Sequence, residues 1–456
     1  MAIKTLSAHE WAHYQGAFIA LWTDSTHAYA LYEPGELVAV ALQDGAYPAL
    51  PYAGAGWFQC LAKDLNGHIA MGFHADHTAI EQHRTADGRA AWPNFAGPER
   101  EGVHQYAIGP VYGAITEPVH WRFFALGERV LKLQTRLGYA HRGVLGLMRG
   151  KSPRQAARYA ARISGDATVA HSIAFARAAE AAMGVDAPER AQILRGIMAE
   201  IERLANHCGD LGDLAAMAGG AVVATRLALF REYIASTAQA AFGHRLMMDI
   251  VIPGGVVEDI AEAGKDWVQD VLASIEDELP NIERALTDSN LREAFKGIGV
   301  IPVELARAYN AGGYVGRASG LACDARQEPG YPPYQTANFR SDMRQMGDIE
   351  ARIGVRLAEI GEAIRLIREF FAILPTGPLA FALPAEDGTG LGVAESFRGA
   401  VWHWLKIEKG LIQACFLVDA SASHWALLEH VATTSNLVDF PIIERSINPS
   451  AAGIDG

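Results

Sequence analysis

The chain has 456 residues, half of them hydrophobic and a fifth charged, and a formal net charge of −13 at pH 7. This composition and length predict a globular protein of roughly two to three structural units with a sizeable core. The negative charge argues against nucleic acid or an anionic membrane surface as a direct partner, because both favour clustered Lys and Arg. No run of about 18 apolar residues is present, so no segment is expected to span a bilayer.

The start of the chain, MAIKTLSAHEWAHYQGAF, has no apolar signal core, which indicates a cytoplasmic protein. Four cysteines are scattered singly, and isolated cysteines in a reducing compartment are commonly buried small hydrophobic residues. They are Cys60, Cys208, Cys323 and Cys415. No Gly-x-Gly-x-x-Gly follows a strand, so the sequence offers no sign of NAD binding.

Residues 1–95 combine aromatic residues, Gly and Pro with short apolar runs, which predicts a small α+β domain. The turn-rich segment 86–102 is interpreted as the linker into the second domain, 96–456. Three histidines lie just before this linker without regular helical spacing or a cysteine partner, and we interpret them as surface residues rather than metal ligands. They are His74, His77 and His83.

The second domain is expected to be mainly helical. Apolar residues recur at three- and four-residue steps from 152 to about 295, which is typical of a helix bundle. Ser152 and Pro153 mark one helix start, and Pro188 marks another. The expected helices cover 161–181, 188 onward, 222–248, 258–287 and 347–371. His207 and Asp210, inside the second of these, are expected to fix helix packing.

Two antiparallel strand pairs are expected beside the helices. WRFFALG and RVLKLQTRLG would form one pair, turned at 126–128, and the dyad His141–Arg142 would end its second strand. The other hairpin would turn at Lys409–Gly410. The predicted fold class is therefore α+β, mainly α: a large helical bundle with peripheral antiparallel β hairpins and a small N-terminal α+β domain.

Eight blocks of sequence suggest a family. They are GPVYGAITEPVHWRF, GYAHRG, RISGDATVAHSIAF, EIERLANHCGDLG, FGHRLMMDIVIPGGV, RASGLACDAR, ESFRGAVW and SINPSAAG. In content and order they resemble the large subunit of membrane-bound, energy-converting nickel–iron hydrogenases and the related 49 kDa subunit of respiratory complex I. The segment AGWFQCLAKDLNGH also resembles a degraded copy of the complex I 30 kDa domain.

The chain departs from the hydrogenases at the metal. Their nickel and iron are held by two Cys-x-x-Cys motifs, and the four matching positions here are Ser164, Ala167, Ser450 and Gly453. A soft nickel–iron centre needs thiolates, which hydroxyl and methyl groups do not supply. The resemblance therefore implies a family member that binds no metal and does not turn over hydrogen.

The complex I pattern is also incomplete. Its quinone head group is held by a His and a Tyr, and the matching positions here are Thr116 and Gly165. A quinone remains a candidate ligand of a remodelled cavity, with His141, His171 or Tyr112 as hydrogen-bond donors. No residue carried over by motif demands it.

Polar residues around the lost metal site persist. Glu117 matches a hydrogenase Glu assigned to proton transfer, and Arg398 matches the Arg that overhangs the metals. Four more polar residues lie in the same motifs: His141, Arg142, Asp166 and His171. We expect these six to line a proton or quinone cavity, because a buried Glu near an Arg suits proton exchange. The alternative is that they are ordinary buried ion pairs and hydrogen-bonded histidines.

Three functions remain open at this level. The first is a metal-free large subunit of a complex I-related oxidoreductase, peripheral on the cytoplasmic side of the cell membrane. It would bind no cofactor except a quinone-like acceptor. It would dock on a small complex I-like partner carrying an iron–sulfur cluster and on integral membrane partners, some complex I-like and some antiporter-like. The second is a non-catalytic structural or regulatory subunit. The third, least favoured, is an active nickel–iron hydrogenase. An open cavity at the four lost positions would favour the first, and solid packing the second.

Overall fold

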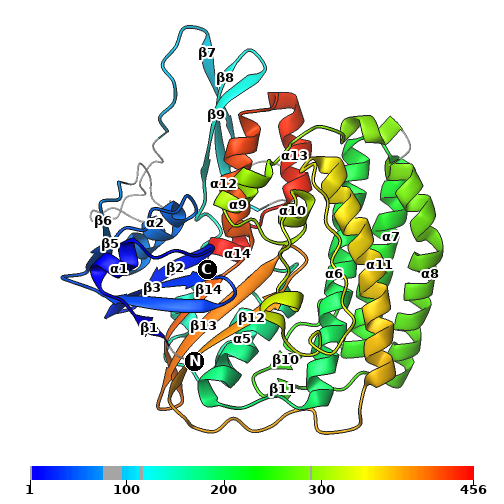
Figure 1. Cartoon of the computed structure of the whole chain (residues 1–456). Helices are drawn as coiled ribbons and strands as arrows, with labels where there is room; N and C mark the ends of the chain where they lie inside the picture. Colours follow the sequence, from blue (N-terminus) through cyan, green and yellow to red (C-terminus); the bar gives the residue numbers. More distant parts are fainter. Residues whose placement is uncertain (1–2, 75–94, 112–116, 288–289, 456) are drawn as a thin grey trace.

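The computed structural model describes residues 3–74, 95–111, 117–287 and 290–455 (Figure 1). At its centre a helix packs against a three-stranded antiparallel sheet of order β12-β13-β14. These elements are β12 (Gly388–Glu395), β13 (Ala400–Glu408), β14 (Leu411–Val418) and α5 (Thr168–Met183). The hairpin β13–β14 turns at 409–410, as the sequence predicts.

The strand β12 approaches α5 closely because glycines alternate along it. A Cβ atom added at Gly390 would lie 2.0 Å from the carbonyl oxygen of Ala178, and Gly388 and Gly392 meet the helix backbone in the same way. The glycines, spaced two residues apart along the strand, face carbonyl groups spaced four residues apart along the helix. The two spacings agree because four helix residues rise about 6 Å and two strand residues about 6.6 Å. Sequence analysis did not predict β12, since glycine disfavours strands unless another backbone comes close.

The helix expected over 161–181 starts later than predicted. One short helix, α4 (Pro153–Ala160), ends before this range, and α5 begins only at Thr168. The intervening residues form turns instead. Burial is not limited to one face of α5, because the helix is covered nearly all round by the sheet and the bundle. Ser152 caps α4 by accepting from the amide of Gln155 at 3.3 Å, which confirms that helix start.

Four long helices form the bundle at the right of Figure 1. They are α6 (Glu189–Met217), α7 (Ala221–Phe242), α8 (Glu262–Thr287) and α11 (Ile349–Ile373). All four are predicted by their three- and four-residue apolar steps, with ends displaced by a few residues. The predicted mainly α class with small antiparallel sheets is thereby confirmed.

A second sheet projects from the body at the top of Figure 1. Its strands are β7 (Val103–Ile108), β8 (His120–Leu126) and β9 (Arg129–Arg136), all antiparallel. The pair β8–β9 is as predicted, and β7 adds an unpredicted outer strand. The dyad His141–Arg142 does not end β9, which stops at Arg136. It lies in the loop before α3 (Val144–Met148).

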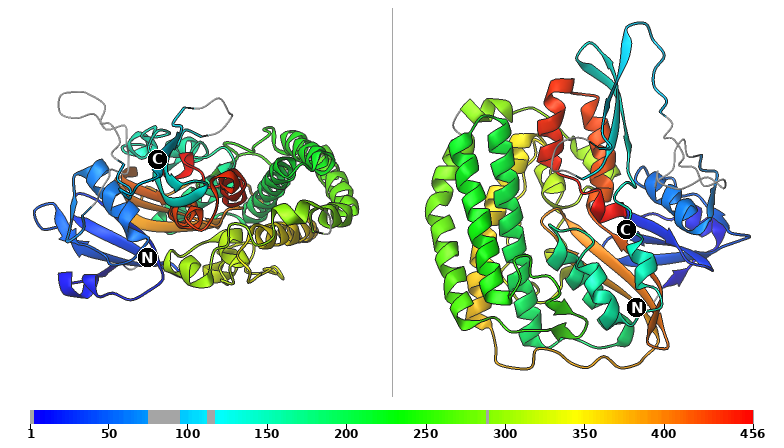
Figure 2. Two further views of the ribbon diagram at one scale, coloured as in Figure 1. Left: turned by 90° about the horizontal axis from the view of Figure 1, so that it is seen from above. Right: turned by 180° about the vertical axis from the view of Figure 1, so that it is seen from behind.

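The N-terminal region packs its own sheet, of order β1-β4-β3-β2, against the central sheet. The ring of Trp22 stacks on Phe416 at 4.9 Å, and Tyr29 lies 4.9 Å from Trp404. Figure 2 shows this region and the bundle on opposite sides of the central sheet. The elements of the N-terminal region are β1 (Lys4–Thr5), α1 (Ala8–Ala12), β2 (Phe18–Thr23), β3 (His27–Tyr32), β4 (Glu36–Ala41), β5 (Ala46–Pro48), α2 (Ala55–Asn66) and β6 (Ile69–Met71). The domain boundary at residue 95 stays a prediction.

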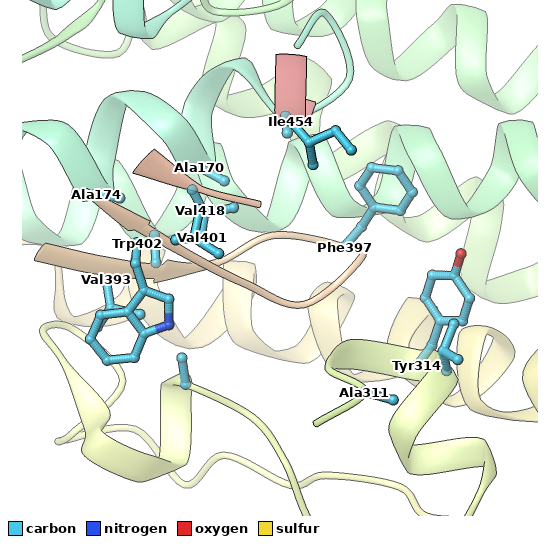
Figure 3. Close-up of a cluster of buried hydrophobic side chains, with 14 of the residues drawn as sticks. Ala170, Ala174, Ala311, Tyr314, Val393, Phe397, Val401, Trp402, Val418 and Ile454 are labelled. Carbon is cyan, nitrogen blue, oxygen red and sulfur yellow. The ribbon is translucent and has the colours of Figure 1, made fainter. Parts of the chain in front are cut away.

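The remaining elements are mostly short and connect the larger ones. They are β10 (Val251–Ile252), β11 (Gly255–Val256), η1 (Asn290–Ala294), α9 (Val303–Ala308), α10 (Gly313–Ala318), η2 (Arg326–Gly330), α12 (Ser421–Ala432), η3 (Leu437–Asp439), α13 (Phe440–Ile447) and α14 (Ala452–Asp455). Figure 3 shows Phe397, in the turn after β12, with Ile454 of α14 on one side and Tyr314 of α10 on the other. The core therefore reaches the last turn of the chain.

Three of the four cysteines are buried as predicted, and Cys323 is partly exposed. His74 is exposed, in agreement with its assignment to the surface, whereas His77 and His83 lie outside the described residues. Across the described ranges, none of the helices combines the length and apolar character that crossing a bilayer requires.

Candidate functional site

The two segments that carry the lost cysteine positions meet at the N-terminus of α5. Ser164 Oγ lies 3.4 Å from Ser450 Oγ, and the amide of Gly453 donates to Ser450 Oγ at 3.0 Å. Ala167 is the N-cap residue of α5 and is fully buried. We call Ser164, Ala167, Ser450 and Gly453 the cradle. Segments almost 300 residues apart in sequence thus come together where the family motifs place them.

A glutamate from the neighbouring bundle helix fixes this end of α5. Glu202 of α6 accepts hydrogen bonds from the amides of Val169 and Ala170 at 2.7 and 3.1 Å. A carboxylate at a helix N-terminus satisfies amides that have no partner within the helix. Burial raises the pKa of Glu202 to about 8, against the effect of these two amides.

Glu117 binds the C-terminal half of the cradle. Its carboxylate accepts from Ser450 Oγ at 3.0 and 3.1 Å, from the amide of Ala452 at 3.0 Å, and from the amide of Ala451. Burial raises its pKa, while the Ala452 amide acts in the opposite direction. Glu117 is thus a mostly buried carboxyl that donors hold in place, a combination that allows it to carry or release a proton.

Arg398 closes the other side of the cradle. Its guanidinium forms a two-point ion pair with Asp166, 2.9 Å between Nη1 and Oδ1, and its Nε donates to the carbonyl of Asn448 at 2.6 Å. Although burial opposes ionisation, this guanidinium holds the pKa of Asp166 below its usual range. Asp166 also accepts from Ser164 Oγ at 2.5 Å. Arg398, Asp166 and Ser164 therefore form one continuous polar chain.

His171 lies beneath the cradle in a buried group that sequence analysis did not foresee. Its Nδ1 is 3.1 Å from His403 Nε2, and its Nε2 is 3.3 Å from Asp419 Oδ2. Burial and then the neighbouring His171 hold the pKa of His403 well below its usual range. The period of two along β13 places His403 on the same face as Val401, which was the available signal for its burial.

Asp419 occupies the space next to Gly453. A Cβ atom added at Gly453 would lie 3.0 Å from Asp419 Cγ and 3.2 Å from its Oδ2. The carboxylate is held there by the amide of Ser421 at 2.8 Å. A cysteine side chain at 453 could not be accommodated without moving Asp419.

The chemistry of the cradle does not fit a nickel–iron centre. Its side chains are two hydroxyls, one methyl and one hydrogen, and a Cβ atom at the position nearest Asp419 would require Asp419 to shift by a few tenths of an ångström. Thiolates, the donors that such a centre needs, are missing from all four positions. Over the described ranges, no three or more His, Cys, Asp or Glu side chains gather in an arrangement that could hold a metal ion.

Two cavities meet at the cradle's rim. One, of about 1190 Å³, runs between α6 and α7, and the other, of about 620 Å³, lies beneath β8 and α13. Both are lined by Glu117 and Asp166; Gly165 lines the first, and Ser450 and Arg398 line the second. The interior of the cradle is packed, with Ser164 only 1% exposed. The site is therefore closed where a metal would lie and open at its polar rim.

The other predicted residues are placed differently. Arg142 lies outside the rim and donates to the carbonyls of Arg162 and Ile163 at 2.8 and 2.5 Å, so it braces the turn before Ser164. His141 lines a separate cavity of about 200 Å³. Thr116 and Tyr112 lie outside the described residues.

The expected packing role of the two α6 residues is consistent with their contacts. His207 Nε2 lies 2.6 Å from Glu359 Oε2 of α11. Asp210 forms an ion pair of 3.1 Å with Arg356 and accepts from Asn448 Nδ2 at 2.9 Å. These contacts hold α6 to α11 and to the segment that carries Ser450.

Comparison with known families places the chain in two overlapping groups. Residues 218–411 match the family described as respiratory-chain NADH dehydrogenase, 49 Kd subunit, and residues 142–218 match nickel-dependent hydrogenase. The two matches adjoin at the end of α6.

Individual relatives give the same result. The chain is 29% identical over 321 residues to the alpha subunit of the membrane-bound hydrogenase of Pyrococcus furiosus, covering 66% of this chain and 75% of that one. It is 26% identical over 362 residues to a subunit of the NADH-quinone oxidoreductase of Clostridium beijerinckii, covering 76% of this chain and 96% of that one.

A solved structure shares the fold. A chain of the membrane-bound sulfane sulfur reductase, an archaeal respiratory membrane complex, superposes with a TM-score of 0.74 at 23% identity, covering 79% of this chain and all of that one. The motifs, the fold and these relatives agree. Over residues 142–411 the chain is therefore similar to the large subunits of nickel–iron hydrogenases and to the 49 kDa subunit of the respiratory NADH dehydrogenase, and it has no cysteine at the four positions that match the metal ligands of the hydrogenases.

Proposed function

We propose that the chain is a metal-free large subunit of a complex I-related oxidoreductase, and that its chemistry takes place at the rim of the cradle. The observation that carries this proposal is the junction of two cavities at Glu117 and Asp166, beside a packed cradle interior. An electron acceptor can lie in these cavities, whereas a nickel–iron centre finds no thiolates at the four cradle positions.

Each rim residue has a distinct task in this proposal. The acceptor is quinone-like, and its reduction takes up two electrons and two protons. Glu117 supplies the two protons to the acceptor in the smaller cavity one after the other and regains each from water, since burial has raised its pKa. Arg398 is held by Asp166 and the carbonyl of Asn448, so its charge has a fixed position beside the acceptor's oxygens.

The electrons come from outside the chain in this proposal. An iron–sulfur cluster in a small partner protein delivers them, and integral membrane partners anchor the assembly at the cytoplasmic face of the membrane. This arrangement is inferred from relatives named as subunits of a membrane-bound hydrogenase and of an NADH-quinone oxidoreductase. Of itself the chain binds no iron–sulfur cluster and no nucleotide.

The test is purification of the tagged chain from its native membranes, followed by mass spectrometry, metal analysis and a quinone-reduction assay on one sample. Co-purifying iron–sulfur and membrane proteins with quinone reductase activity support the proposal. Stoichiometric nickel with hydrogen turnover would instead identify an active hydrogenase. A chain that purifies alone would overturn the proposed assembly.

A second candidate is a purely structural subunit, which the packed interior of the cradle favours. Glu117→Gln distinguishes the two, with Glu429→Gln on α12 as a control for the substitution itself. Under the first proposal Glu117→Gln lowers acceptor reduction at least tenfold in a fully assembled complex. Under the second it leaves turnover unchanged, or it weakens assembly because Glu117 ties α14 to the core.

A further inference from the structure

A cluster of buried charges lies on the other side of the turn that carries Arg398. Three guanidiniums and four carboxylates meet there, each residue no more than 7% exposed. They are Arg203, Arg317 and Arg326, with Glu200, Asp324, Glu359 and Glu395. We call these seven residues the charge cluster. They come from α6, α10, the loop before η2, η2 itself, α11 and the end of β12, so the cluster joins the bundle to the central sheet.

The charges of the cluster do not balance. With three positive and four negative groups, one carboxylate is in surplus when all are ionised. His207 touches Glu359, but burial lowers the pKa of its imidazole, so it does not supply the fourth positive charge. Arg177 lies over the ring of Tyr331, 5.0 Å from its centre, and not against the carboxylates. An uncompensated buried charge is costly, and taking up a proton removes it.

Glu395 is the carboxylate with the weakest pairing. Its carboxylate contacts a single guanidinium, with 3.3 Å between Arg317 Nη1 and Glu395 Oε1. Its other oxygen, Oε2, accepts from the amide of Ala325 at 3.0 Å. In contrast, Asp324 receives Nε and Nη2 of Arg326 at 3.0 and 2.7 Å. Burial, and then the charge of Asp324, raise the pKa of Glu395 to about 7.

A pocket reaches Glu395 from the surface. It has a volume of about 270 Å³ and is lined by Glu395, Asp324 and Cys323, and also by the exposed carboxylates of Glu33 and Glu328. A water molecule occupies about 30 Å³ of liquid, so the pocket has room for several waters between bulk solvent and the cluster.

We propose that Glu395 is a proton-binding site, and that it exchanges its proton with water through the pocket beside Glu33 and Glu328. In this exchange the carboxylic O–H of Glu395 breaks, the proton passes to a pocket water, and the carboxylate stays beside Arg317. The charged and titratable groups that face Glu395 from the surrounding elements are Arg203, Arg317, Cys323, Asp324, Arg326 and Tyr331.

This site is independent of Glu117 and of the proposed function. Arg203 donates to the carbonyls of Glu395 and Ser396 at 2.8 and 3.0 Å, so the charge cluster holds the turn from which Arg398 extends into the cradle. Glu395 and Glu117 therefore lie on opposite sides of the turn that carries Arg398: Glu395 on the side of the charge cluster and Glu117 on the side of the cradle.

The test is an infrared pH titration of the full-length chain, which follows the carboxylic C=O stretch of protonated side chains. Glu395→Gln keeps the shape of the protonated side chain and should remove one proton equivalent with a midpoint near pH 7. Glu444→Gln is the matched control: its carboxyl also has a pKa raised to about 7 by burial, but it lines the cradle-side cavity. Glu444→Gln should remove a different carboxylic C=O band, and that band should still be present in the Glu395→Gln variant.

The access route is tested by filling the pocket. Ala322 is exposed and lines it, so Ala322→Trp should slow the Glu395 signal at least tenfold after a pH jump and leave the Glu444 signal unchanged. Ala382→Trp, in an unrelated surface cavity, should leave both unchanged. An unaltered titration in Glu395→Gln overturns the proton site, and an unaltered rate in Ala322→Trp overturns the route. If Glu395→Gln does not fold, the comparison of Ala322→Trp with Ala382→Trp still tests whether a carboxyl exchanges its proton through this pocket.

Discussion

Buried charges are balanced differently on the two sides of the turn at 395–399. On the cradle side, Arg398 pairs with one carboxylate, Asp166, whose side chain is 33% exposed to the cavities. On the bundle side, three guanidiniums share four carboxylates that are almost fully buried. A matched pair holds its charges over the neutral pH range, whereas an unmatched cluster keeps a proton. The number of opposite charges around a buried carboxyl thus decides whether that carboxyl titrates in the neutral pH range.

Arg317→Met would have the largest effect on this comparison. It removes the one guanidinium that contacts Glu359, Asp324 and Glu395 together in this buried site, which should lower the free energy of unfolding by about 3–5 kcal/mol. Arg365→Met is the control: this partly exposed arginine of α11 pairs with Glu362 and Glu369 at the surface, and its loss should cost at most about 1 kcal/mol. Urea unfolding measures both. Equal losses would mean that the cluster contributes no more than a surface pair.

Arg398→Met should cost less than Arg317→Met. The freed Asp166 is one-third exposed and can be hydrated, so we expect a loss of about 1.5–3 kcal/mol, the range for a hydrogen bond to a charged group. The same urea unfolding experiment gives the value. A loss equal to that of Arg317→Met would show that the cradle side is as dry as the bundle side.

Gly453→Cys tests whether the cradle could be restored. Its Cβ would meet Asp419, and such overpacking costs about 1–3 kcal/mol. Ser450→Cys, which keeps the shape of the side chain, should cost less. Thermal unfolding of each variant, with Gly453→Cys repeated in an Asp419→Ala background, provides the measurement. If Asp419→Ala fails to relieve the loss, Asp419 is not the obstacle.

Glu202 should also make the stability of the chain depend on pH. Glu202 has a folded-state pKa of about 8, above its ordinary value near 4.5, so the folded chain binds more protons than the unfolded chain between these values. Its contribution to stability is complete below about pH 4.5 and is lost as the pH rises towards 8, by at most about 1.4 kcal/mol per pH unit. Glu202→Gln should flatten this slope in unfolding curves recorded from pH 5 to pH 8. A steeper slope would contradict the assignment.

Much of the architecture was predictable because it depends on local patterns. The four bundle helices follow from apolar residues at three- and four-residue steps, and both hairpins follow from paired strands around short turns. The four lost ligand positions follow from the resemblance to the two hydrogenase motifs, because the residues around the replaced cysteines still match. The locations of Ser164, Ala167, Ser450 and Gly453 needed no structure.

What the tertiary structure decided is which of these segments meet and what fills the space between them. β12 is a strand only because α5 covers its glycines, and α5 starts at Thr168 because Glu202 of another helix caps it there. The partners Asp419 and Glu395 could not be found from sequence, since Gly453 and Arg317 lie far from them along the chain. Periodicity describes one element at a time, whereas burial of a charge depends on every element packed around it.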